Sequence, residues 1–250
     1  MRLFSEPTQL VADTFLNELE KSICLDSKPN KDVKSTFYKP SSLNCLRMMF
    51  YYRNSTKIDE AGRPASSIGI LQSGEDRHLR IQNAITHMKQ NGFDCEWVDI
   101  ETFIKEHNLS HLEVISKKEF ETTVYNKTLD LLFLCDGIVK INGSYFIIEI
   151  KTENANSFYK RISVAEEHKH QAACYSLSFN INRVIFIYEN RDLCLKKSFL
   201  FTVPQSLKNE VVDIIKRCNE YVIKKELPIK IACKSCSYCD YKKKCSNNEV

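Results

Sequence analysis

The stretch from residue 129 to 151, LDLLFLCDGIVKINGSYFIIEIK, limits the possible folds more than any other, because an Asn142-Gly143 pair stands between two apolar runs. An Asn-Gly pair in this setting favours a two-residue type I′ hairpin turn, since that turn needs a positive φ at both central residues. With a two-residue loop, the numbers of facing residues sum to 285, so Asp136 faces Glu149. The sequence therefore predicts a hairpin with two opposed carboxylates, their Cβ atoms about 5 Å apart.

A divalent cation is the simplest reason for two carboxylates to face each other here. Like charges across a strand pair are destabilising, and the apolar flanks predict a strand buried on both faces, where unpaired charge is costly. Carboxylate oxygens suit Mg²⁺ or Mn²⁺, which would reverse the repulsion. Lys151, two residues beyond Glu149, points to the same face. The alternatives are a structural ion pair or a different strand register.

Composition indicates one folded domain without membrane segments. The chain has 250 residues, of which 43% are hydrophobic and 27% charged, which is ordinary for a globular protein. We expect a cytoplasmic location, since we find neither a signal-peptide core nor an apolar run of membrane-spanning length. Eleven cysteines without a secretory signal indicate a reducing compartment, where clustered thiols more often bind metal than form disulfides.

Hydrophobic periodicity and turn residues predict an α/β fold in one domain, with a mixed central sheet flanked by helices. We expect helices over residues 8–24, 43–54 (with an N-cap at Ser41-Ser42), 74–92, 165–177 and 204–225. We expect strands near 93–98, 119–125, 129–140, 144–152, 183–189 and 196–203, with loops at 27–35 and 54–68 and a polar, partly helical insert at 99–118. The domain 1–250 then divides into an N-terminal helical part (1–72), a core (73–204) and a C-terminal helix with cysteines (205–250).

The spacing Asp136-x12-Glu149-Ile150-Lys151 resembles the P-D-(D/E)-x-K core of the restriction-endonuclease-like nuclease superfamily. One departure is Cys135, which stands where that family often has proline before the aspartate; the position shapes the strand and carries no chemistry.

Three further segments resemble the RecB-type branch of that superfamily. Gln171 and Tyr175 are similar to its Q-x-x-x-Y motif, Gly74-E-D-R-His78 resembles its upstream histidine segment, and RVIFIYENR resembles its following strand. Taken alone, His78 on an apolar helical face is more often a core residue than a ligand, and Gln–Tyr pairs one helical turn apart are common.

The resemblance implies a metal-dependent nuclease with a restriction-endonuclease-like fold. It implies a Mg²⁺ or Mn²⁺ ion held by His78, Asp136, Glu149 and the main-chain carbonyl of Ile150. Lys151 would position or help activate the attacking water, and Gln171 and Tyr175 would contact DNA or order the site. Metal ions can supply much of the catalysis of phosphodiester hydrolysis, because a lone general base contributes only about 10²–10⁴-fold.

A second group consists of cysteines with the spacing Cys233-x2-Cys236-x2-Cys239-x5-Cys245. This density favours a metal site, and thiolates select an iron–sulfur cluster or zinc. Unliganded thiols are the remaining alternative. Apart from these four and Cys45, six cysteines are scattered along the chain. We expect these six to be buried small hydrophobic residues.

The same resemblance bears on the cysteines. CRISPR-associated RecB-like exonucleases and the AddB nuclease domain hold a [4Fe-4S] cluster with three C-terminal cysteines and one that precedes the core. This implies Cys45, Cys236, Cys239 and Cys245 as cluster ligands that join the two ends of the chain. Alternatively, Cys233 completes a four-cysteine zinc site.

Together these features predict a Mg²⁺- or Mn²⁺-dependent deoxyribonuclease, an exonuclease or end-processing enzyme that acts on single strands or duplex ends. Recombination, repair or CRISPR-type processing is the expected setting, with recombination or CRISPR adaptation proteins as possible partners. The alternatives are a non-catalytic DNA-binding or assembly subunit and a sequence-specific endonuclease. Cleavage of labelled DNA distinguishes the enzyme from the binding subunit.

Overall fold

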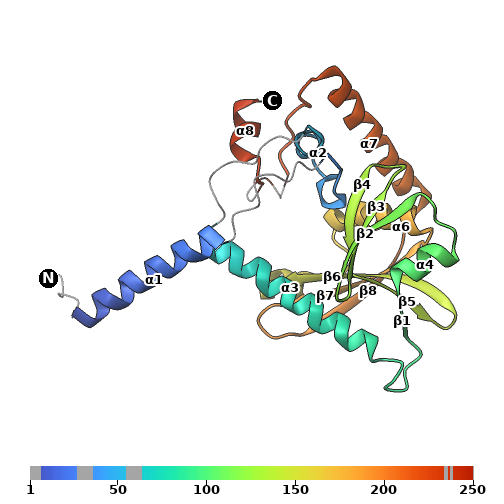
Figure 1. Ribbon diagram of the computed structural model, residues 1–250, viewed down its shortest axis with the longest axis horizontal. Helices are drawn as coiled ribbons and strands as arrows, with labels where there is room; N and C mark the ends of the chain where they lie inside the picture. The colour runs from blue at the N-terminus through green and yellow to red at the C-terminus, as the bar shows by residue number, and fades with distance from the viewer. Residues whose placement is uncertain (1–6, 27–35, 55–63, 234–235, 237–238, 250) are drawn as a thin grey trace.

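The computed structural model describes residues 7–26, 36–54, 64–233, 236 and 239–249. Its helices are α1 (Pro7–Asp26), η1 (Pro40–Ser42), α2 (Leu46–Arg53), α3 (Ala65–Thr86), α4 (Ile100–Glu106), α5 (Ala155–Lys160), α6 (Glu166–Phe179), α7 (Gln205–Lys224) and α8 (Lys242–Asn247). Its strands are β1 (Glu96–Val98), β2 (Leu112–Lys118), β3 (Glu121–Asn126), β4 (Leu131–Cys135), β5 (Gly137–Ile141), β6 (Ser144–Glu153), β7 (Arg183–Asn190) and β8 (Lys196–Thr202). Figure 1 shows α1 extending away from the body that contains the sheets.

A mixed five-stranded sheet is the centre of the molecule, as the sequence predicts. Its strand order is β1-β5-β6-β7-β8, in which β6 and β7 are parallel and the other neighbours are antiparallel. Both faces are covered: Ile147 packs in the cluster that includes residues of α6, whereas Ile148 and Ile150 pack with Ile81 and Ile85 of α3. The double coverage explains why β6 reads as an almost continuous apolar run.

The predicted hairpin turn and its register are confirmed. Asn142 and Gly143 have φ values of 47° and 72°, the left-handed conformation that a type I′ turn requires. Ile141 pairs with Ser144, Val139 with Phe146, and Gly137 with Ile148.

The predicted strand 129–140 is wrong as a single element, because the chain breaks at Asp136 into β4 and β5. β4 leaves the central sheet and pairs with β3, which pairs with β2, in a separate antiparallel sheet. Gly137 makes the close approach at the break possible, since a Cβ atom there would lie 2.2 Å from the Trp97 ring. The apolar run carries no signal of this change of sheet.

Other differences concern boundaries. α3 begins at Ala65, so the predicted loop 54–68 ends too late, and the second half of the predicted insert 99–118 forms β2. β2 is largely exposed, which explains its weak periodicity. Cys45 occupies the N-cap of α2, and Ser42 lies in η1 instead. The predicted loop 27–35 lies outside the described residues. No described helix has the length and apolarity needed to cross a membrane.

Candidate active site and cysteine group

Asp136 lies at the break between β4 and β5, where two elements fix its position. Its Oδ2 accepts a hydrogen bond of 2.7 Å from the main-chain nitrogen of Ile150 on β6. Its own carbonyl oxygen accepts a 2.8 Å bond from Gln82 Nε2 on α3. Asp136 is 7% exposed. The hairpin thus brings this carboxylate to the strand that carries Glu149, although Asp136 itself is outside the regular pairing.

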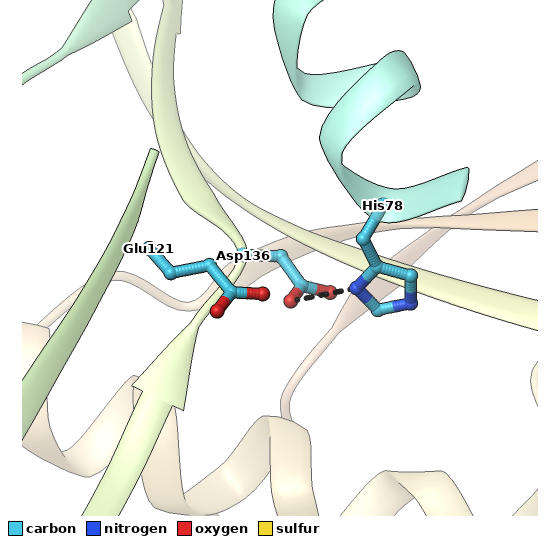
Figure 2. A group of neighbouring side chains, drawn as sticks. All are labelled: His78, Glu121 and Asp136. Atoms are coloured by element: carbon cyan, nitrogen blue, oxygen red, sulfur yellow. Dashed lines mark hydrogen bonds and ion pairs between the residues drawn. The ribbon is translucent and has the colours of Figure 1, made fainter. Parts of the chain in front are cut away.

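His78 approaches the same carboxylate from α3. Its Nδ1 lies 3.3 Å from Asp136 Oδ1, as Figure 2 shows. Burial lowers the pKa of His78, but the hydrogen bond that His78 donates to Asp136 and the charge of Asp136 raise it by more, so the net pKa is raised. The predicted proximity of His78 and Asp136 is therefore present in the structure.

The buried Glu149 forms an ion pair with the half-buried Lys151. Glu149 is 2% exposed, and its Oε1 pairs with Lys151 Nζ. Its Oε2 has no hydrogen-bond partner among the described residues. Burial and the charge of Asp136 raise the pKa of Glu149 against the opposing effect of Lys151. For Lys151, burial lowers the pKa, and the two carboxylates raise it by more, so the ammonium group stays protonated.

A chain of hydrogen bonds orders Lys151 from α6. Lys151 Nζ donates to Gln171 Oε1 at 3.1 Å, and Gln171 Nε2 donates to the Tyr175 hydroxyl at 2.6 Å. That hydroxyl donates to the carbonyl oxygen of Leu134 at 2.9 Å. Tyr175 is 1% exposed, and its hydrogen bonds fit a role in ordering the site. Contact of Gln171 or Tyr175 with DNA stays a prediction.

Glu121 is a residue of the site that sequence reasoning missed. One ligand atom from each of His78, Glu121 and Asp136 lies within 4.8 Å of the others (Figure 2). Glu121 begins β3, and the pairing of Thr122 with Cys135 places it beside Asp136. Only the pairing of β3 with β4 creates this neighbourhood, so no local motif could have indicated it. The predicted ligand Glu149 is not in this group.

The donor set suits a hard divalent cation. Asp136 and Glu149 are buried carboxylates, with His78 beside the first and Lys151 paired to the second, and Glu149 Oε2 has no partner among the residues that the structure describes. Burying charge without compensation is costly. Imidazole and carboxylate ligands suit Mn²⁺, and carboxylates suit Mg²⁺. Ile150, whose carbonyl the sequence predicts as a further ligand, is fully buried in β6.

The cysteines predicted to bind a cluster lie in one region. Cys233 Sγ is 3.5 Å from Cys236 Sγ. Burial and the charges of Cys233 and Cys236 raise the pKa of the Cys45 thiol to about 11. Burial raises the pKa of Cys239, to which Cys236 and Cys245 also contribute. Among the residues that the structure describes, however, no three of these thiols lie within 4.8 Å of one another, so the cluster stays a prediction.

Helix α2 also contacts the C-terminal segment directly. Arg47 on α2 is 7% exposed; its Nε donates to the Pro228 carbonyl at 2.6 Å and its Nη1 to the Cys245 carbonyl at 2.8 Å. The Tyr51 hydroxyl donates to the carbonyl oxygen of Glu249 at 3.0 Å. These bonds hold Cys45, one residue before α2, close to the C-terminal cysteines. Nothing in the sequence indicated this role of Arg47.

Comparison with known proteins gives only distant structural likenesses. No protein-family model matches the chain, and no curated protein matches it. The crystal structure of SSO0001 matches with a TM-score of 0.48 at 18% identity, covering 91% of this chain and 94% of that one. An alkaline exonuclease (LHK-Exo) from Laribacter hongkongensis matches with a TM-score of 0.47 at 12% identity, covering 78% and 92%. Its complex with dAMP matches with a TM-score of 0.47 at 11% identity, covering 77% and 90%.

Proposed function

We propose that this protein is a Mg²⁺- or Mn²⁺-dependent DNA nuclease, an exonuclease or end-processing enzyme. The observation that carries the proposal is the pair of buried carboxylates Asp136 and Glu149, beside Lys151 and His78, in which Glu149 Oε2 has no partner among the described residues. A divalent cation bound there would supply a partner for that oxygen. The resemblance of the same residues to the P-D-(D/E)-x-K nuclease core indicates phosphodiester hydrolysis as the reaction in which this cation would take part.

The ion would be held by Asp136 and Glu149, with His78 and the Ile150 carbonyl as further ligands. When bound, it would polarise the phosphate and lower the pKa of a coordinated water. Lys151 Nζ, held by Glu149 and Gln171, is a protonated donor that can orient water or offset phosphate charge.

Gln171 and Tyr175 keep that donor in place. Tyr175 is anchored on the Leu134 carbonyl of β4, two residues before Asp136. The hydrogen-bond chain therefore links the position of Lys151 to the strand that leads into the metal-binding carboxylate, which supports a fixed geometry for in-line attack.

We also propose a [4Fe-4S] cluster bound by Cys45, Cys236, Cys239 and Cys245. Support comes from the thiolate donor set and from the gathering of these residues where α2 contacts the C-terminal segment. Iron content and colour after anaerobic purification test the proposal; a colourless protein with bound zinc would favour the site that includes Cys233.

Cleavage of end-labelled single- and double-stranded DNA in Mn²⁺, with free and blocked ends, tests the nuclease. Wild type and Lys140→Ala, an exposed lysine on the same hairpin, should degrade DNA with free ends, and Lys151→Ala should not. Tight DNA binding without cleavage by any of the three proteins would instead support a non-catalytic subunit, acting with recombination or CRISPR adaptation proteins.

A further inference from the structure

The three-stranded sheet reaches the candidate metal site through the Glu121 side chain. Glu121 is the first residue of β3, directly after the turn that joins β2 to β3. The β3–β4 pairing ends with Thr122 opposite Cys135. Glu121 and Asp136 are the next residues on the two sides, so they lie beside each other just beyond the end of the pairing. In Figure 2 the Glu121 carboxylate points toward Asp136, on the side opposite His78.

The distances suit shared coordination. Ligand oxygens about 2.0–2.1 Å from an octahedral ion lie about 3 Å apart in cis and about 4.2 Å apart in trans. His78 Nδ1 and Asp136 Oδ1 are 3.3 Å apart, close to the cis separation. Ligand atoms of all three residues lie within 4.8 Å of one another. Small side-chain movements therefore suffice for the three groups to bind one ion.

The charge around Glu121 supports the same conclusion. Glu121 is half-buried, and no described cation forms an ion pair with it. Glu149, which is 2% exposed, lies close enough to Asp136 and His78 for its charge to act on both, and its Oε2 is unpartnered. Glu121 and Asp136 thus lie beside His78, and the buried Glu149 acts on the same Asp136 and His78, a second sign that a cation belongs among them.

We propose that Glu121 is a metal ligand, which makes the three-stranded sheet part of the metal site. This inference rests on the proposed metal-dependent function and adds a ligand that the P-D-(D/E)-x-K resemblance does not supply. It predicts that the metal ion joins β3, α3 and the β4–β5 break.

Mn²⁺ affinity of the full-length protein, measured by electron paramagnetic resonance of free Mn²⁺, tests the role of Glu121. Loss of groups that merely support metal ligands weakens affinity about 10–100-fold, so we expect Glu121→Gln to weaken Mn²⁺ binding at least about tenfold. Glu121→Asp keeps the charge and shortens the side chain; it should weaken binding as well if the carboxylate coordinates the ion. The matched control is Glu119→Gln, an exposed carboxylate in the same turn, which should bind Mn²⁺ like wild type.

Asp136→Asn separates this inference from the proposed function. If Glu121→Gln and Glu121→Asp bind Mn²⁺ like wild type while Asp136→Asn does not, Glu121 is not a ligand and the nuclease proposal stands. If Asp136→Asn also binds like wild type, the metal site itself is wrong.

Discussion

Two buried glutamates on neighbouring strands have opposite electrostatic surroundings. Glu189 on β7 is fully buried, and its carboxylate pairs with Arg77, Arg80 and Lys196 at 3.2, 2.6 and 3.0 Å. Burial raises its pKa, but the hydrogen bonds from these three cations lower it by more, so the net pKa is lowered. Glu149 on β6 has Lys151 as its ion-pair partner, and its net pKa is raised.

The difference shows that burial of a carboxylate does not by itself mark a metal site. Glu189 has more than one positive partner, so its charge is compensated without a metal ion. Through Arg77 and Arg80 it holds the part of α3 that carries His78. Glu149 has one ion-pair partner, and its Oε2 has none among the described residues. We therefore infer a structural role for Glu189 and propose metal binding for Glu149 and Asp136.

The largest expected effect is on cleavage by Asp136→Asn. The substitution keeps the shape of the Asp136 side chain and removes its negative charge. We expect DNA cleavage in Mn²⁺ to fall about 10²–10³-fold, the typical cost of removing one preorganised electrostatic group. Asp130→Asn, whose side chain pairs with Arg53 away from the site, is the control; cleavage by Asp136→Asn within tenfold of wild type contradicts the assignment.

Metal binding should stabilise the protein through one carboxylate site and not the other. At a free Mn²⁺ concentration of 100 times Kd, the free energy of unfolding should rise by about 2.7 kcal/mol. Thermal or urea unfolding with and without Mn²⁺ measures the gain. Glu189→Gln should keep it, and Asp136→Asn should lose it; the reverse pattern would show that the roles are exchanged.

Glu189→Gln should destabilise the metal-free protein. Removing one partner of a buried ion pair costs about 3–5 kcal/mol, but the Arg80 and Lys196 side chains are 50% and 43% exposed, so we expect a loss of about 2 kcal/mol. Urea unfolding in EDTA at pH 7 measures it. Because the pKa of Glu189 is lowered, its contribution is present above the unfolded pKa of about 4.3 and is lost as pH falls through the folded value.

Glu149→Gln should have the smallest effect and the opposite sign. Since the pKa of Glu149 is raised, the metal-free protein loses stability as pH rises from about 4.3 through the folded pKa. Glu149→Gln has no carboxyl group to ionise at this position, so it does not lose this stability as pH rises. Lys151 still has the charge of Asp136 nearby. We expect the variant to exceed wild type by about 1 kcal/mol at pH 8 in EDTA, with the difference vanishing near pH 4. A variant less stable than wild type at pH 8 would show that Lys151 fully compensates Glu149.

The sequence predicts the part of the site that depends on local geometry. The Asn142-Gly143 turn sets the register, and that register brings Asp136, one residue before β5, beside the strand that carries Glu149. The helical spacing of Gln171 and Tyr175 places both near Lys151. What depends on long-range pairing stays hidden: the change of sheet at Asp136 lies within an unbroken apolar run, and Glu121 reaches the site only because β3 pairs with β4.

The most direct test of the central claim is a crystal structure of the full chain with Mn²⁺, recorded with anomalous scattering from the metal. We expect an anomalous peak about 2.1 Å from oxygens of Asp136 and Glu149. A saturating Mn²⁺ concentration that leaves these carboxylates without a peak, with Glu149 Oε2 still unpartnered, would contradict it.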